Sequence, residues 1–157
     1  MKTVKLGDDA LFSIEMDATS PQAAKIKIVI GGDVAACDDD ATRMDVFLPR
    51  LQDNLANYRE DLASELIEDK ADYIMQYFTR RCNEADTQAE SRFFASLFVL
   101  WQTSPAFAGE DFIFLASEAK DRVIWNGHPS LKDVILPAKY LRHLFDDLVN
   151  WAKGIEK

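Results

Sequence analysis

The chain has 157 residues, of which 48% are hydrophobic, 11% aromatic and 29% charged, and these values indicate a folded globular protein rather than a disordered one. No stretch approaches eighteen uncharged apolar residues, which excludes a membrane-spanning helix, and the charged first nine residues argue against a secretory signal. The formal net charge is −9, and residues 33–72 hold 12 acidic and 4 basic residues, so that this segment carries −8 and would repel nucleic acid and anionic lipid.

The length suits one domain that covers residues 1–157 and buries a hydrophobic core. Cys37 and Cys82 are the only cysteines and form no CxxC motif, so no disulfide framework is expected. Each lies on an apolar pattern and is interpreted as a core residue. We therefore expect a reduced protein of the cytoplasm, and a redox role for either thiol stays open.

Strand periodicity dominates the N-terminal part of the chain. Residues 11–17 and 25–30 each alternate between apolar and polar side chains, which is the period of a strand with one buried face. The pair Gly31-Gly32 predicts a tight turn into a short third strand over residues 34–37. The pattern predicts an antiparallel meander with one face in water.

Helical periodicity follows. One apolar stripe spans residues 44–62, and we expect Pro49 in the first turn of a helix that begins near Leu48. A second stripe spans residues 67–82 and predicts another helix, with Ser64 as its N-cap. These are the two central helices of the predicted fold.

Asp38, Asp39 and Asp40 stand just ahead of the first predicted helix. The residues after them lack the alternating acids and central glycine of a calcium loop, and Gly31-Gly32 lacks the lysine of a phosphate-binding loop. Carboxylates in this position can accept hydrogen bonds from the free amides of a helix start. We interpret the three aspartates as the helix entry, and expect no metal and no cofactor.

The second half of the chain predicts more strands. Residues 91–101 are apolar on both faces and predict a central strand beside a hairpin formed by residues 112–116 and 122–125. The side chains expected to be buried in that strand are Phe93, Leu97, Val99 and Trp101.

A last helix follows a short apolar run at residues 134–136, with Pro137 expected in its first turn. Its buried side should carry Leu141, Leu144, Phe145, Leu148 and Trp151. Together, the elements predict an α+β fold: a mostly antiparallel sheet with an N-terminal meander, later strands and a hairpin, two central helices and a C-terminal helix.

One charge pattern points to a partner. Glu65, Glu68, Asp69 and Asp72 share one face of the second predicted helix, where like charges repel each other. The helix dipole accounts for the first acids better than for Asp72, which lies two turns in. A surface kept for a basic partner accounts for all four, whereas solubility alone is the competing explanation.

The loop before the hairpin supplies further candidates for partner binding. Phe107 stands there with Glu110 and Asp111 beside it, and we expect it to act as a hydrophobic anchor. No catalytic pattern accompanies these residues: His128 lies in a Gly/Pro turn, His143 has no second ligand at zinc spacing, and no GxSxG motif is present. The sequence favours a protein that is not an enzyme.

Four stretches resemble the small immunity proteins of bacterial polymorphic-toxin and type VI or contact-dependent secretion systems. They are the Gly-Asp of residues 7–8, the Phe-Ser-Ile-Glu of residues 12–15, the Ile-Gly-Gly of residues 30–32 and the Arg-Val-Ile-Trp of residues 122–125. The resemblance does not extend to residues 42–91. It implies a protein that binds a cognate toxin acting in the cytoplasm and neutralises it by occlusion, without catalysis.

Two other functions remain open. The chain could be a small cytosolic enzyme with a site assembled from scattered residues, of which Asp38, Asp39 and His128 are the leading candidates. It could also be an adaptor or chaperone that offers a sheet edge or helix groove to a client. On the immunity hypothesis the partner is a basic toxin, with neither nucleic acid nor membrane bound, and the oligomeric state stays open.

Overall fold

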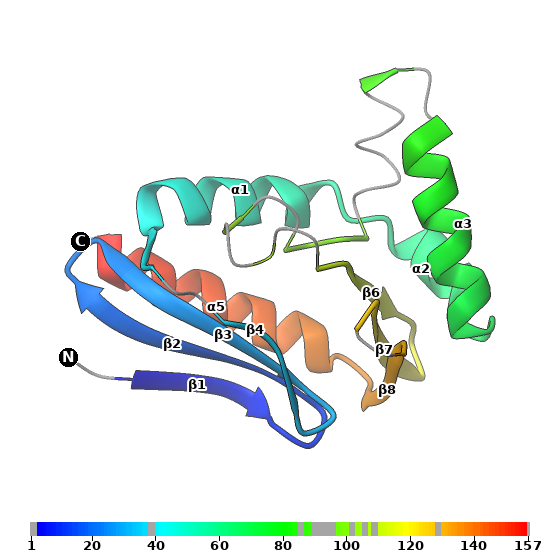
Figure 1. The fold of residues 1–157 in the computed structure, drawn as a ribbon, viewed down its shortest axis with the longest axis horizontal. Helices are drawn as coiled ribbons and strands as arrows, with labels where there is room; N and C mark the ends of the chain where they lie inside the picture. The colour runs from blue at the N-terminus through cyan, green and yellow to red at the C-terminus, as the bar shows by residue number, and fades with distance from the viewer. Residues whose placement is uncertain are drawn as a thin grey trace.

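The computed structural model describes residues 3–37, 40–84, 87–88, 97–100, 103–104, 107, 110–127 and 130–156. Within these residues the chain forms four helices and eight strands, and the strands pair antiparallel in two sheets (Figure 1). The prediction of an α+β fold is confirmed. The N-terminal sheet and the helices α1 and α5 make one end of the molecule, and the second sheet lies at the other end with α2 and α3 (Figure 1).

The N-terminal sheet is the predicted meander. Its strands are β1 (Thr3–Asp8), β2 (Phe12–Ser20), β3 (Ala23–Ile30), β4 (Asp33–Cys37) and the short β5 (Thr42–Arg43), in the order β1-β2-β3-β4 with β5 also on β3. Alternate apolar residues of β2 and β3 face each other, with Ile14 opposite Ile28. Glu15 and Lys27 lie opposite each other as a cross-strand ion pair of 3.5 Å on the other face. The sequence did not predict β1.

The second sheet has the order β6-β7-β8. Its strands are β6 (Phe112–Ala116), β7 (Lys120–Trp125) and β8 (Lys132–Pro137). The predicted hairpin is confirmed as β6 and β7, but β8 is longer than the predicted run. Pro137 ends β8 rather than opening the last helix, which is α5 (Tyr140–Glu156).

Helix α1 (Met44–Ala56) begins four residues before Leu48, so the predicted start is wrong. Met44 is itself buried and belongs to the apolar stripe, which draws the first turn onto the core. Pro49 therefore lies inside the helix, on its exposed side, where water can satisfy the carbonyl that lacks an amide partner.

The entry to α1 differs from the expected cap. The N-cap residue is Arg43, which makes no side-chain hydrogen bond to the helix, and Asp40 lies upstream of β5. The interpretation of Asp40 as the cap is wrong, because β5 comes between it and the helix. Asp38 and Asp39 lie outside the described residues. Cys37 ends β4 exposed rather than in the core, and the side chain of Cys82 is not among those described.

The first predicted helix, residues 44–62, is broken after Ala56, and its last residues belong to a separate helix, α2 (Glu60–Leu66). The second predicted helix, residues 67–82, is α3 (Ala71–Glu84), which a turn at residues 67–70 joins to α2. Ser64 lies inside α2 and is not an N-cap. The main-chain carbonyls of Ile67 and Asp69 accept hydrogen bonds from the Arg122 side chain, at 2.8 and 2.6 Å. A continuous helix would use these carbonyls internally, so the buried arginine favours the turn.

The predicted central strand is wrong in the part that the structure describes. Residues 97–100 form no strand, and they meet β6 through a hydrogen bond of 2.9 Å from the Phe114 amide to the Leu97 carbonyl. Leu97 and Val99 are buried as predicted. Phe93 and Trp101 lie outside the described residues.

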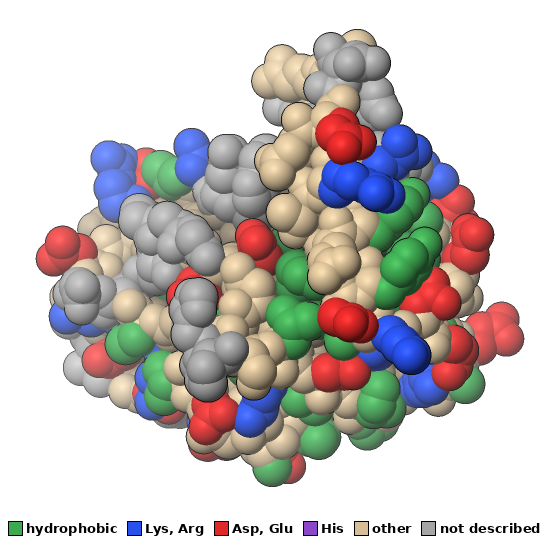
Figure 2. Space-filling model, turned by 45° about the vertical axis from the view of Figure 1, so that its right-hand side comes forward, with side chains coloured by type: hydrophobic (Ala, Val, Ile, Leu, Met, Phe, Trp, Pro, Cys, Tyr) green, Lys and Arg blue, Asp and Glu red, His purple; other side chains and the backbone are tan. Residues whose placement is uncertain are grey.

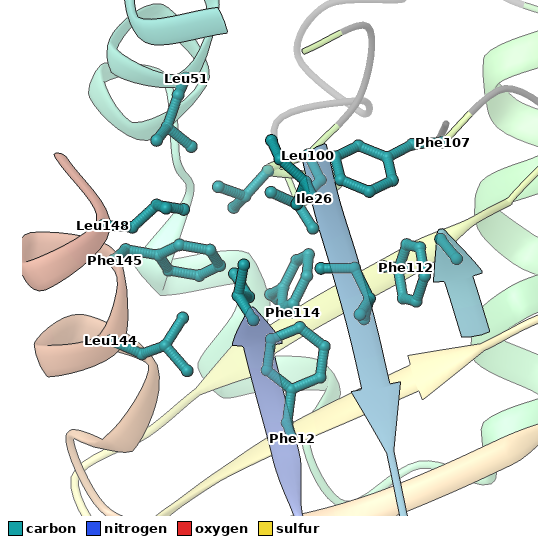
Figure 3. Close-up of a cluster of buried hydrophobic side chains, with 14 of the residues drawn as sticks. Phe12, Ile26, Leu51, Leu100, Phe107, Phe112, Phe114, Leu144, Phe145 and Leu148 are labelled. Carbon is teal, nitrogen blue, oxygen red and sulfur yellow. The ribbon is translucent and has the colours of Figure 1, made fainter. Parts of the chain in front are cut away.

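The hydrophobic core has two parts, one on each face of the second sheet. The larger cluster joins β2, β3, α1 and α5 to one face of β6, and Phe114 contacts Phe12 and Phe145 edge-on at 5.5 and 5.1 Å between ring centroids (Figure 3). The smaller cluster joins α2 and α3 to the opposite face, through Ile113 and Leu115. Successive side chains of β6 thus face opposite clusters, and the second sheet packs against α2 and α3 on one of its faces.

Candidate partner-binding site

The turn at residues 67–70, together with the adjoining ends of α2 and α3, forms what we call the α2–α3 corner. One buried arginine holds this corner in place. Arg122 is 5% exposed and makes a bidentate ion pair with Asp133 of β8, at 2.7 and 2.8 Å. Its Nη1 donates to the carbonyls of Ile67 and Asp69. The corner is therefore tied to two strands by charge-assisted hydrogen bonds, which hold its backbone in one geometry.

The four acids predicted to share one helix face are spread around this corner. Glu65 lies in the last turn of α2, Glu68 and Asp69 in the turn, and Asp72 in the first turn of α3. Glu65, Glu68 and Asp72 are exposed, whereas Asp69 is half-buried. The argument from a single face fails because the helix is broken, but the acids still succeed one another along one exposed bend.

Their charges are only partly compensated. Residues 60–72 hold six acids and one base, a net charge of −5. Glu68 pairs with Lys120 of β7 at 2.8 Å, and Oδ1 of Asp72 accepts a hydrogen bond from the Tyr73 amide at 2.9 Å. The corner is thus a compact source of negative potential that a basic surface would meet favourably.

An aromatic ladder continues from the corner along α3. Tyr73 and Tyr77 stack with centroids 6.2 Å apart, and the guanidinium of Arg81 lies 5.8 Å from the Tyr77 ring. Tyr73 is 56% exposed, and a hollow of about 440 Å³ opens beside it on α3. Figure 2 shows hydrophobic side chains next to acidic and basic ones on the side of the molecule where α3 lies. The ladder could have been predicted from the sequence, because Tyr73, Tyr77 and Arg81 follow one another at intervals of four residues.

The loop before β6 holds Phe107 in the core rather than on the surface. Phe107 is 6% exposed and lies edge-on to Phe112, with centroids 6.3 Å apart, so it belongs to the larger core cluster. Phe107 is therefore a core side chain in the protein alone, and its role as a partner-binding anchor stays a prediction.

Its two acidic neighbours bind groups within the protein. Glu110 accepts a hydrogen bond from the Trp125 indole at 2.6 Å, and the backbone amide of Asp111 donates to the Asn126 side chain at 2.9 Å. Burial, helped by the charge of Glu110, raises the pKa of Asp111. Both acids brace the loop against the end of β7.

The structure leaves the candidates for an enzyme site untested. Asp38, Asp39 and His128 lie outside the described residues, and His143 is exposed on α5. Among the residues that are described, no three side chains gather as metal ligands would. No helix in this part of the chain has the length and apolarity to cross a bilayer.

The stacked tyrosines and the arginine beside them are side chains of the kinds that are enriched at protein–protein interfaces. The chain belongs to the family Immunity protein 42, whose family model matches residues 1–151. The match confirms the resemblance to small immunity proteins of polymorphic-toxin systems. Comparisons with curated proteins and with solved structures give no match.

Proposed function

We propose that this protein binds a cognate toxin at the α2–α3 corner and neutralises it by occlusion rather than by catalysis. Family membership supports a toxin as the partner. The observation that carries the choice of surface is the exposed series Glu65, Glu68 and Asp72 on a corner that the buried Arg122 fixes.

Rigidity matters because binding orders the groups that it engages. The corner is already held by hydrogen bonds from β7, so little conformational freedom is lost when a partner covers it. Tyr73 and Tyr77 lie next to the acids and offer large, stiff side chains of the kind that dominate binding energy. The acids would then set the rate of association with the toxin, and the tyrosines would set the lifetime of the complex.

The charge of the corner supports a basic toxin. Proteins that act on nucleic acid present Lys and Arg to phosphates, so a toxin of this kind carries a surface complementary to the corner. We infer that the toxin acts in the cytoplasm, where the immunity protein meets it. With a net charge of −9, the protein itself would bind neither nucleic acid nor anionic lipid.

The test is a charge reversal with a matched control. Glu65→Lys/Asp69→Lys/Asp72→Lys should slow association with the toxin about tenfold or more at low salt, because electrostatic steering acts on the encounter rate. The control Asp53→Lys/Asp146→Lys/Asp147→Lys makes the same charge change at exposed positions of α1 and α5. Stopped-flow association at increasing salt measures both, and circular dichroism checks that both fold.

The proposal fails if the corner variant folds, associates as fast as wild type and still protects cells that co-express the toxin. It also fails if the control variant slows association as much as the corner variant does, because net charge would then be the cause. In either case the acids serve solubility.

A further inference from the structure

Strand β8 forms one edge of the second sheet, whose order is β6-β7-β8. Apart from its pairing with β7, the main chain of β8 makes no hydrogen bond to the described part of the chain. A strand edge of this kind carries a row of free N–H and C=O groups that can pair with another strand. The edge of β8 is therefore a candidate surface for an extended segment.

The hydrogen bonds at the two ends of β7 show which groups of β8 face outward. The Ser117 amide donates to the Lys120 carbonyl at 2.9 Å, and at the other end the Asn126 amide donates to the Asp111 carbonyl at 3.2 Å. The register between β6 and β7 is regular from end to end. Even-numbered residues of β7 therefore direct their main-chain groups toward β6, and odd-numbered residues direct theirs toward β8.

The outward groups of β8 lie at its odd-numbered positions. The odd-numbered residues of β7 are opposite the even-numbered residues of β8, and these pairs exchange the hydrogen bonds between the two strands. The amides and carbonyls of Asp133 and Ile135 thus face away from the sheet. Pro137 occupies the next outward position, where the absence of an N–H removes no hydrogen bond to β7.

The opposite edge of the sheet is covered by the protein itself. On β6 the outward amide of Phe114 donates to the Leu97 carbonyl at 2.9 Å, and the outward carbonyl of Phe114 accepts from the Tyr58 hydroxyl at 2.7 Å. The fold therefore satisfies one edge of this three-stranded sheet from within and leaves the main chain of the other edge open.

The side chain of Ile135 adds apolar surface to the open edge. It is 51% exposed, although it lies in the middle of a strand. A branched apolar side chain at such a position can pack against a side chain of an added strand. The edge thus offers both main-chain hydrogen bonds and an apolar contact.

The open edge also lies next to the α2–α3 corner. Ile135 is opposite Arg122 in the register of β7 and β8. Arg122 donates to the carbonyls of Ile67 and Asp69 in the corner. A strand added to β8 would lie about 4.8 Å beyond it, so a partner that covers the corner can reach the edge with the same surface.

We propose that a strand of the toxin pairs with the edge of β8 and places an apolar side chain against Ile135. The outward groups favour an extended segment, because a helix uses its own N–H and C=O groups internally. The net charge of −5 in residues 60–72 favours a strand with basic residues on its flank. A second copy of this chain would instead bring the same net charge of −9 to the contact. The proposal rests on the proposed function and deepens it.

Amide hydrogen exchange, followed by NMR on the whole protein, tests the pairing directly. In the free protein the amides of Asp133 and Ile135 should exchange faster than that of Val134, which bonds to β7. In the complex with the cognate toxin the two outward amides should exchange about tenfold or more slowly than in the free protein. The proposal is overturned if they are already as protected as Val134 in the free protein, or if the toxin leaves their exchange unchanged.

Two variants at one position separate the main chain from the side chain. Ile135→Pro removes an outward amide and leaves the hydrogen bonds to β7 in place, whereas Ile135→Ala removes only the side chain beyond Cβ. Ile135→Pro should weaken toxin affinity about fivefold more than Ile135→Ala does, which is the contribution of about one main-chain hydrogen bond. Val46→Ala removes an exposed apolar side chain from α1 and should leave the affinity unchanged.

Equal affinities of Ile135→Pro and Ile135→Ala, with both variants folded by circular dichroism, would overturn the proposal. A wild-type dimer that Ile135→Pro converts to a monomer in size-exclusion chromatography would also overturn it, because a second copy would then occupy the edge. If Ile135→Pro does not fold, hydrogen exchange of wild type decides alone. Wild type that binds no toxin contradicts the proposed function, whereas a complex with unprotected amides at β8 contradicts only this proposal.

Discussion

Arg122→Met tests whether the buried arginine is what makes the α2–α3 corner rigid. Methionine keeps the apolar stem of the side chain, so little space opens around it, but it removes every hydrogen bond of the guanidinium. Four bonds are lost: two to Asp133, one to the Ile67 carbonyl and one to the Asp69 carbonyl. The variant therefore separates the corner from the sheet without altering the corner itself.

The expected loss of unfolding free energy follows from the burial of the partners. Breaking a buried ion pair by removing one member costs about 3–5 kcal/mol. The Asp133 side chain is 38% exposed and can be hydrated again, which places the cost near the lower end, at about 3 kcal/mol. In a chain of 157 residues that free energy corresponds to a fall of about 6–12 °C in Tm.

Urea unfolding, followed by circular dichroism, measures this cost, and Arg43→Met is the matched control. Arg43 also binds an aspartate through two nitrogens, but its side chain is 72% exposed and that of Asp45 50%. The surface pair should contribute less than about 1 kcal/mol. If Arg122→Met costs no more than Arg43→Met, the arginine does not hold the corner. Hydrogen exchange that rises everywhere rather than first in residues 67–75 would also refute the reasoning.

Two further variants probe the start of α5. Burial raises the pKa of Asp121 above its ordinary value of 3.8, against the lowering effects of the Leu141 and Lys139 amides and of His143. The folded state therefore holds the Asp121 proton more tightly than the unfolded state does. As pH rises from below 3.8 through the raised pKa, wild type should lose stability relative to Asp121→Asn. A difference between the two proteins that stays constant with pH in urea titrations would contradict this. Lys139→Gly should raise the unfolding free energy by about 1 kcal/mol, because glycine adopts the positive φ without strain. Lys153→Gly inside α5 should lower it by a similar amount, and equal effects would count against the strain.

Elements with a local cause could be predicted from the sequence. The period of two in β2 and β3 and the apolar stripe of α5 arise from the residues that form them, and both are in place. The break between α2 and α3 could not be predicted, because it depends on an arginine more than fifty positions away. Residues 97–100 are buried as their composition requires, but burial does not distinguish a strand from an irregular segment.

The candidate site shows the same division. The acids around the corner could be identified from the sequence, because a local excess of acidic residues is visible without knowledge of the fold. Charge alone does not identify Tyr73 and Tyr77, although their spacing of four residues, beside Ile74 and Phe78 of the predicted apolar stripe, was present in the sequence.

The second sheet separates two cores, and that division bears on the turnover of the protein. The cluster beneath α2 and α3 rests on Ile113, Leu115 and Ile124, and the larger cluster lies on the opposite face of the same strands. Opening of these two helices would leave the larger cluster on the opposite face intact, and cellular proteases cleave such transient openings. A toxin bound at the corner would suppress this opening in proportion to its occupancy. The immunity protein would then be long-lived while it holds a toxin and short-lived while idle, so its abundance would follow demand without a separate sensor.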